Sequence, residues 1–305
     1  MVIQPRFGKL PPLVSGVLTK LMYDRIELMP GRYQSTLADY RLDLSRFEYV
    51  ERCFAMRGFF EWRIAAVAAC VVSAGDTVFE GGAHIGTETH NYAALVGKAG
   101  QVVSFEADQR LARSLSGELS AAGLTQCHVR PKALGEAAGV AYFDAAPEVG
   151  GNSGLGALAP GQSTAGDQVE VEVETLDETA AKFGAPRLVV MDIQGGELGA
   201  LRGAQRLLAE VRPFIVLEVE SRCLEVLGAS AQDVWDILHE NDYTCWRFTR
   251  TGLTRVGSVA DDELSDWFAV PDEAADVVAQ VKKAFLRGAI LPPASRLSPL
   301  SSLRR

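Results

Sequence analysis

The sequence predicts a doubly wound α/β fold, in which a mostly parallel sheet is covered by helices on both faces. Short apolar runs such as Leu188–Met191 contain no polar residue, as strands buried on both faces require. Helical segments alternate with these runs, and that alternation is typical of parallel βαβ units. The chain has 305 residues, 48% of them hydrophobic, which is enough for a large core.

The elements of this domain follow one another from residue 59. A helical segment ends at the Ser-Ala-Gly of 73–75, and later helices begin after a glycine turn or an aspartate, where helices commonly start. The strands are short β-branched or aromatic runs, which favour a buried sheet. We expect helices at 59–72, 87–97, 108–122, after 192 to 210 and at 271–286, and strands at 77–80, 101–106, 126–131, 187–192, 213–219 and 267–270.

Other parts of the chain do not follow this rhythm. Residues 1–58 are expected to form an α+β lead-in or cap, with a helix near 13–23 and a strand near 38–44. Residues 168–174 read QVEVEVE, which predicts a half-buried antiparallel strand with solvated glutamates. The glycine-rich stretch 147–166 is interpreted as a long loop that either binds a ligand or is disordered. The doubly wound domain would then span 59–286, and 287–305 would be a solvated or partly ordered tail, with a dimer arm or partner contact as the alternative.

Composition excludes several classes of protein. Thirty basic and 39 acidic residues give a net charge of −9, so nucleic acid is a disfavoured partner. The longest apolar run, 64–72, is far shorter than the roughly 20 residues of a membrane span, and no signal peptide is recognised. The five scattered cysteines favour buried thiols over disulfides or structural zinc. We therefore predict a cytoplasmic protein without a membrane span.

The turn after the first strand of the domain carries the clearest chemical signal. It reads EGGAHIG over 80–86, and its spacing matches neither a dinucleotide-binding turn nor a P-loop. The acid Glu80 would repel phosphates and attract an ammonium or sulfonium group. Glu106 ends the next strand, twenty residues after Gly86, where an acid accepts hydrogen bonds from ribose hydroxyls. Together these features point to S-adenosylmethionine rather than NAD or ATP.

At this point the chain resembles the FkbM-type S-adenosylmethionine-dependent methyltransferases. The likeness covers roughly 58–220, and its most specific segment is 189–204. The segments that carry it are VFEGGAHIG (78–86), VVSFEAD (102–108), VETLDE (173–178), VVMDIQGGELGALRGA (189–204) and FIVLEVE (214–220). The resemblance implies a seven-stranded Rossmann-like class I methyltransferase sheet, mostly parallel, with an antiparallel last strand in a hairpin of 243–248 and 267–270.

The resemblance also implies cofactor-binding residues. It carries that role onto Glu80, Gly82, Ala83, Gly86, Glu106 with its neighbour Ala107, and Asp192. The chain departs from the family's pattern at four positions: Glu80 stands for Asp, His84 for Asn, Gln194 for Glu and Val190 for Lys.

Methyl transfer to a hydroxyl needs a group that accepts its proton. Asp192 and Glu218 end neighbouring strands and are candidate catalytic acids. They could share a proton, hold a substrate cation or bind a divalent metal, although a metal is not favoured. His84, in the glycine turn, is the other candidate base, with a structural role as the alternative.

Three further residues are candidates on weaker grounds. Asn152 and Ser153, in the long loop, are candidate substrate-binding residues, with a solvated turn as the alternative. Glu61, in the helix entering the domain, is expected to close over the methionine end of the cofactor or to lie at the surface.

The leading functional prediction is O-methylation of a small metabolite, such as a sugar, a polyketide or another natural-product or glycan moiety. The alternatives are N-methylation of a small metabolite and a catalytically inactive cofactor-binding module. A homodimer is compatible with the sequence.

Overall fold

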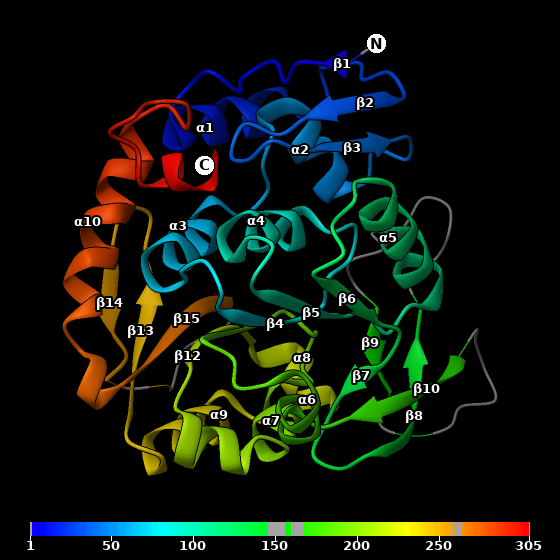
Figure 1. Ribbon diagram of the computed structural model, residues 1–305, viewed down its shortest axis with the longest axis vertical. Coiled ribbons are helices and arrows are strands. Elements are labelled where there is room, and N and C mark those ends of the chain that lie inside the picture. Colours follow the sequence, from blue (N-terminus) through cyan, green and yellow to red (C-terminus); the bar gives the residue numbers. More distant parts are fainter. Residues whose placement is uncertain are drawn as a thin grey trace.

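The computed structural model describes residues 2–145, 156–159, 161, 168–257, 259 and 264–304. Within these residues the largest sheet has eight strands, in the order β14-β13-β15-β12-β11-β4-β5-β6 (Figure 1). The strands are β4 (Thr77–Gly81), β5 (Gln101–Phe105), β6 (Cys127–Arg130), β11 (Leu188–Met191), β12 (Phe214–Glu220), β13 (Tyr243–Phe248), β14 (Leu253–Arg255) and β15 (Leu264–Pro271).

The pairing of these strands confirms the predicted doubly wound topology. Strands β6, β5, β4, β11 and β12 are parallel, and β15 runs antiparallel to β12. The order reverses between β4 and β11, so the carboxyl ends of these two strands border the crevice where such sheets bind ligands. The described sheet has eight strands rather than the seven expected, because β14 adds to the edge by pairing with β13.

Helices cover both faces of the sheet (Figure 1). Alternate residues of each strand face opposite sides, so Val78 belongs to one core cluster and its neighbour Phe79 to the other. The first cluster includes residues of α3 (Trp62–Val71), α4 (Thr87–Val96) and α10 (Val277–Ile290). The second includes residues of α6 (Leu176–Phe183), α7 (Glu197–Arg202), η2 (Leu207–Val211), α8 (Ser221–Val226) and α9 (Ala231–Glu240). Helix α5 (Gln109–Ala121) packs against β6.

The helix expected from 192 to 210 is interrupted. Helix α7 ends at Arg202, and η2 follows after a short break. At Gly203, a Cβ atom would lie 2.1 Å from the backbone oxygen of Gly135. The close approach of these two backbone segments therefore requires glycine at position 203.

A small second sheet is inserted between β6 and α6. It comprises β7 (Ala133–Leu134), β8 (Gly139–Asp144), β9 (Ala157–Leu158) and β10 (Gln168–Glu174), in the order β7-β10-β8-β9. As predicted, β10 is antiparallel to β8. The expectation of solvated glutamates is wrong for Glu174, which is 7% exposed, because it lies between basic side chains described below.

The lead-in forms a separate layer above the main sheet in Figure 1. Its three strands are β1 (Val2–Ile3), β2 (Gly31–Gln34) and β3 (Arg41–Leu44), and its helices are α1 (Pro12–Met22) and α2 (Tyr49–Arg57). The predicted strand starts at Arg41 rather than at 38. Strand β2 and helix α2 were not predicted, because polar residues interrupt the periodic spacing of their apolar residues.

The C-terminal segment is not a solvated tail, contrary to expectation. After η3 (Asp272–Ala274) and α10, the chain turns back and ends in η4 (Pro299–Arg304). Leu300 and Leu303 are fully buried because η4 packs against α3 and α4. No helix in the described part of the chain is long and apolar enough to cross a membrane.

Candidate active site

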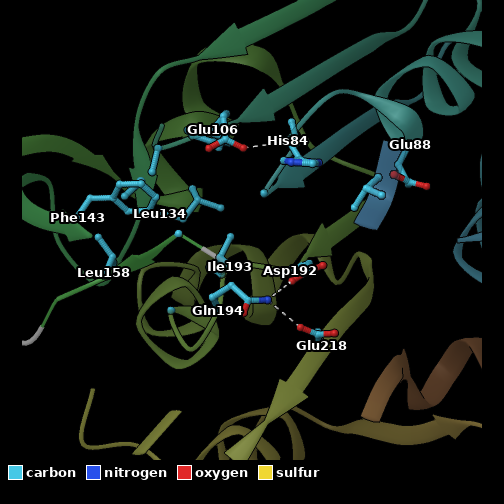
Figure 2. Close-up of a pocket in the computed structure, with 18 of the residues that line it drawn as sticks. His84, Glu88, Glu106, Leu134, Phe143, Leu158, Asp192, Ile193, Gln194 and Glu218 are labelled. Atoms are coloured by element: carbon cyan, nitrogen blue, oxygen red, sulfur yellow. Dashed lines mark hydrogen bonds between the residues drawn. The ribbon is translucent and has the colours of Figure 1, made fainter. Parts of the chain in front are cut away.

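A pocket lies at the carboxyl ends of β4, β5, β11 and β12, with a cavity volume of about 220 Å³ (Figure 2). One end is largely apolar and is lined by Ala107, Leu134, Phe143, Leu158 and Ile193. The other end carries the side chains of Glu88, Asp192, Gln194 and Glu218. The pocket therefore offers an apolar surface and an anionic surface to the same ligand.

The glycine turn after β4 forms the base of this pocket. Gly82 has φ +81°, and a Cβ atom there would lie 1.9 Å from the Asp192 backbone oxygen. The amides of Gly82 and Ala83 both donate to the Phe105 oxygen at 3.0 Å, which holds the turn against β5. Gly86 also has positive φ, and its missing Cβ leaves room for Leu115. The turn can thus follow only this path with glycine at both positions.

Glu106 is held by backbone amides from two segments. Its Oε2 accepts from the His84 amide at 2.7 Å (Figure 2), and its Oε1 accepts from the Asp108 amide at 2.8 Å. Burial raises its pKa to about 7 despite these hydrogen bonds. Each carboxylate oxygen has a second lone pair, so Glu106 can still accept hydrogen bonds from a ligand in the pocket.

Glu80 lies behind the pocket and does not line it. It is 3% exposed, and its Oε2 accepts hydrogen bonds from Thr89 Oγ1 and Ser104 Oγ, each at 2.6 Å. Burial raises its pKa to about 7. Other atoms cover the Glu80 carboxylate, so it does not contact a ligand in the pocket directly, as the sequence had suggested for a cationic ligand. Glu80 instead supports the glycine turn from behind.

Asp192, Gln194 and Glu218 form a hydrogen-bonded cluster at the polar end of the pocket (Figure 2). The Gln194 amide nitrogen donates to Asp192 Oδ1 at 2.8 Å and to Glu218 Oε2 at 3.0 Å. Burial and the adjacent Asp192 raise the pKa of Glu218 to about 9. Burial also raises the pKa of Asp192, although its side chain is open to the pocket. Near neutral pH, Glu218 therefore holds a proton.

Glu197 was part of a quoted motif, but the sequence reasoning gave it no role. It is 1% exposed, and its two oxygens accept from the amides of Ile193 and Gly195 at 2.9 and 3.0 Å. Burial raises its pKa to about 7. Glu197 thus holds the turn that carries Gln194, whose φ is +50°. Its position five residues after Asp192, as the last residue of the pattern D-x-x-G-x-E over 192–197, was the sequence signal for this role.

Glu88 was also missed as a pocket residue. It lies in the first turn of α4, accepts a hydrogen bond from Thr87 Oγ1, and has its pKa raised to about 7 by burial. The Glu61 amide donates to Glu88 Oε1 at 3.3 Å. Glu88 follows Gly86 by two residues, and this closeness to the glycine turn was the sequence signal that could have placed it in the pocket.

The remaining predicted residues lie in different surroundings. His84 lines the pocket, and burial lowers its pKa to about 4, so its imidazole is neutral near pH 7. Glu61 does not line the pocket and lies 3.7 Å from Arg63 in an ion pair. Asn152 and Ser153 lie outside the described residues.

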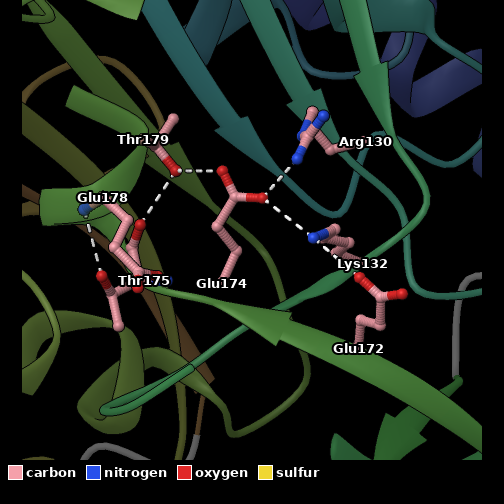
Figure 3. Close-up of polar contacts among 7 residues, drawn as sticks. All are labelled: Arg130, Lys132, Glu172, Glu174, Thr175, Glu178 and Thr179. Atoms are coloured by element: carbon pink, nitrogen blue, oxygen red, sulfur yellow. Dashed lines mark hydrogen bonds and ion pairs between the residues drawn. The ribbon is translucent and has the colours of Figure 1, made fainter. Parts of the chain in front are cut away.

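A charged network flanks the apolar end of the pocket (Figure 3). Glu174 Oε2 lies 2.5 Å from Arg130 and 3.4 Å from Lys132, and Lys132 also contacts Glu172 at 2.8 Å. Lys132 lines the pocket, but these carboxylates balance its charge. The pocket therefore has no excess of positive charge with which to bind a polyphosphate.

The chemistry of the pocket fits S-adenosylmethionine. The apolar end suits an adenine ring, the Glu106 carboxylate offers a hydrogen-bond acceptor of the kind that ribose hydroxyls require, and the carboxylates at the polar end favour a cationic sulfur or ammonium group. Within the described residues, no group of three or more His, Cys, Asp or Glu side chains has an arrangement that could hold a metal ion.

Fold and pocket together define a class I methyltransferase. The family model of the methyltransferase FkbM domain matches residues 80–245, more than half of the chain. The chain therefore belongs to the FkbM methyltransferase family and is a methyltransferase that uses S-adenosylmethionine.

Solved structures resemble the chain only distantly, and no curated protein matches it. A putative rRNA methylase from Clostridium thermocellum is 11% identical, with a TM-score of 0.43, over 68% of this chain and 93% of that one. The FkbM methyltransferase from Methylobacillus flagellatus KT is 17% identical, with a TM-score of 0.42, over 73% and 66%. An O-methyltransferase from Thermotoga maritima is 12% identical, with a TM-score of 0.38, over 81% and 80%. Likenesses this low carry no argument about the substrate.

Proposed function

We propose that this methyltransferase acts on a hydroxyl group of a small metabolite, such as a sugar, a polyketide or another natural-product or glycan moiety. The observation that carries this proposal is the cluster of Asp192, Gln194 and Glu218 at the polar end of the pocket. A hydroxyl must lose its proton during methylation, and a carboxylate beside the reacting group can take it.

In this proposal Asp192 accepts the proton. Burial raises its pKa, which makes it a better proton acceptor than an aspartate in water. Glu218 holds its own proton because a second negative charge beside Asp192 is unfavourable. Gln194 donates to both groups, so it keeps the Asp192 carboxylate oriented while its charge changes.

The charge balance of the pocket supports the same assignment. When bound, S-adenosylmethionine supplies a methyl group activated by a positively charged sulfur. The ionised Asp192 balances that charge before the reaction, and the protonated Asp192 is neutral after it. The polar end of the pocket therefore has no uncompensated charge in either state, which matters in a largely buried site.

We assign the cofactor contacts to the residues that line the pocket: Glu106 to the ribose, Ala107 beside the adenine, and Gly82 and Ala83 under the methionine chain that extends from the ribose. Glu80 and Gly86 would shape the glycine turn without direct contact. Glu61 would act only through Glu88, whose carboxylate accepts a hydrogen bond from the Glu61 backbone amide.

His84 is the weaker candidate for the base. An imidazole with a pKa of about 4 is a poor proton acceptor at neutral pH. Its backbone amide instead positions Glu106. Asn152 and Ser153 remain proposed substrate contacts, and the acceptor would enter beside Tyr49 of the lead-in and Phe60 just after it, which both line the pocket.

Several broader predictions stand beside this proposal. The methyltransferase domain would extend over 59–286, with residues 1–58 as its cap. The protein would act in the cytoplasm, without nucleic acid as substrate; an acidic pocket supports that choice, since it repels a phosphate backbone.

The test begins with calorimetric titration by S-adenosylmethionine, S-adenosylhomocysteine and NAD, with and without magnesium. Transfer of a labelled methyl group to a panel of hydroxyl- and amine-bearing metabolites then identifies the acceptor. Asp192→Asn should reduce turnover of a hydroxyl acceptor at least about 100-fold, the scale for losing a positioned base. Asp236→Asn is the matched control, because Asp236 does not line the pocket, and it should retain wild-type turnover.

The other outcomes discriminate the alternatives. Turnover of amines alone, unaffected by Asp192→Asn, would refute the hydroxyl assignment and favour N-methylation. Binding of both cofactor forms with no transfer to any acceptor class would instead favour an inactive cofactor-binding module.

A further inference from the structure

The two ends of the chain have a charge opposite to that of the protein as a whole. Residues 1–23 and 277–305 contain nine basic residues and no acidic residue, although the net charge of the chain is −9. The rest of the chain therefore carries all 39 acidic residues. Such segregation places a local positive potential on an otherwise negative molecule.

The fold brings these two ends together. Helix α1 packs against α10, and η4 packs against α10 as well. Figure 1 shows the C-terminal end of α10 and the last residues of the chain beside α1. The basic segments, which are more than 250 residues apart in the sequence, are therefore neighbours in space.

Large apolar side chains are exposed on the same two helices. Leu286 and Ile290 of α10 are 54% and 56% exposed, and Leu297 after it is 74% exposed. On α1 the exposed residues Val14, Val17 and Leu21 recur with helical spacing, so they lie along one face. Exposed aliphatic side chains gathered in this way mark a contact surface rather than scattered surface residues.

Basic side chains lie among these apolar residues. Lys283 and Arg287 share the α10 stripe with Leu286 and Ile290, because residues three and four apart are neighbours on a helix. Lys20 follows the same rule on α1, and Arg296 precedes Leu297. All four basic residues are exposed, and none of them forms an ion pair within the described part of the chain.

We infer that this surface docks onto an anionic lipid membrane. We call it the terminal face, defined by Val14, Val17, Lys20, Leu21, Lys283, Leu286, Arg287, Ile290, Arg296 and Leu297. Helices with basic and aliphatic residues on an exposed face bind in the plane of the membrane surface, with the aliphatic side chains among the acyl chains. Basic residues near anionic headgroups strengthen such binding roughly fivefold each.

Two other occupants fit the same face less well. A second copy of this chain would bring two positively charged faces into contact, which is unfavourable. A nucleic acid would use the basic side chains but would leave the aliphatic ones without a partner, since phosphate contacts dominate that binding. The membrane is the partner that uses both kinds of side chain. The inference does not depend on the identity of the methyl acceptor.

Co-sedimentation of the full chain with vesicles tests the inference. One vesicle preparation contains phosphatidylglycerol and phosphatidylcholine in equal parts, and the other contains phosphatidylcholine alone. We expect binding to the first that exceeds binding to the second at least tenfold and weakens between 0.1 M and 0.5 M salt, because salt screens exposed charges.

Two double variants separate the two contributions. Lys283→Glu with Arg287→Glu should reduce vesicle binding at least about tenfold, and Leu286→Ser with Ile290→Ser should reduce it similarly. Matched controls change exposed residues elsewhere: Arg113→Glu with Arg222→Glu, and Val140→Ser with Val226→Ser. The controls should bind like the wild type, and circular dichroism melts should confirm that all variants fold.

Several results would overturn the inference. One is equal binding to both vesicle types, or binding to neither. Another is a concentration-dependent dimer in analytical ultracentrifugation that the leucine and isoleucine variant abolishes, without vesicle binding. A third is tight binding of single-stranded RNA that depends on Lys283 and Arg287 but not on Leu286 and Ile290.

Discussion

Replacing Gln194 by alanine should impair methyl transfer without unfolding the protein. The Gln194 amide donates to Asp192 at 2.8 Å and to Glu218 at 3.0 Å, and both bonds end on carboxyl groups. A hydrogen bond to a charged group contributes about 1.5–3 kcal/mol, and one to a neutral group such as the protonated Glu218 about 0.5–1.5 kcal/mol. Because Asp192 is open to the pocket, water can replace part of this stabilisation, and we take about 2 kcal/mol as the net loss. That loss corresponds to roughly a 30-fold decrease in kcat/KM.

The Gln194→Glu variant tests the charge argument separately. A third carboxylate between Asp192 and Glu218 would repel both when ionised, so the cluster should take up an additional proton. We expect this variant to keep part of its activity near pH 6 and to lose it progressively toward pH 9. Both substitutions keep a non-glycine residue at φ +50°, so they share the backbone strain of the wild type.

The assay is the initial rate of labelled methyl transfer, measured between pH 6 and pH 9 for each variant. Gln232→Ala is the control, because the exposed Gln232 also donates to a carboxylate, Asp236 at 2.7 Å, but in helix α9 and outside the pocket lining. Wild-type kcat/KM in Gln194→Ala, or a pH profile of Gln194→Glu that matches the wild type, would refute the role assigned to the cluster.

Three further predictions concern the cofactor and the buried acids. Glu106→Ala should weaken S-adenosylmethionine binding by about 1–3 kcal/mol, the scale for charged hydrogen bonds, measured by calorimetry against the exposed Glu210→Ala; unchanged affinity would contradict the ribose assignment. His84→Asn should retain cofactor binding and turnover, because its amide, not its imidazole, contacts Glu106; a loss of turnover with intact binding would reinstate His84 as the base. The melting temperature of the protein without ligand should fall as pH rises from 5 to 9, because burial raises the pKa of Glu218 to about 9 and so favours its protonated form in the folded state. The stabilisation from this proton is fully present below 4.5, the ordinary pKa of glutamate, and is lost as the pH rises through 9. Glu218→Gln should therefore flatten the dependence of the melting temperature on pH. A curve for this variant parallel to that of the wild type would contradict the prediction.

The fold class could be predicted because its signals are local. Runs such as Leu188–Met191 and Phe214–Leu217 are apolar because both faces of these strands are buried, and that requirement shows directly in the sequence. The glycine turn was equally readable, since Gly82 and Gly86 adopt positive φ and have no room for a Cβ atom. Strand β14 and helix α2 were missed because they have too little apolar periodicity to mark them.

The candidate site was only partly readable. The sequence indicated Glu106, Asp192 and Glu218 from their places at strand ends, and all three line one pocket. It did not indicate that Glu80 is covered by Thr89 and Ser104, because side-chain hydrogen bonds between separate elements leave no spacing pattern.

The sequence by itself determined the class of protein: a doubly wound sheet, a glycine turn that excludes phosphate-binding motifs, and the residues of a methyltransferase family. Those features depend on residues that are neighbours along the chain, so they can be recognised from the sequence without the structure. Only the tertiary structure decided how Gln194 joins Asp192 to Glu218, and how the two basic chain ends meet beside α1 and α10. Such contacts arise between segments that are distant in sequence, and the packing of the whole chain is what brings them together.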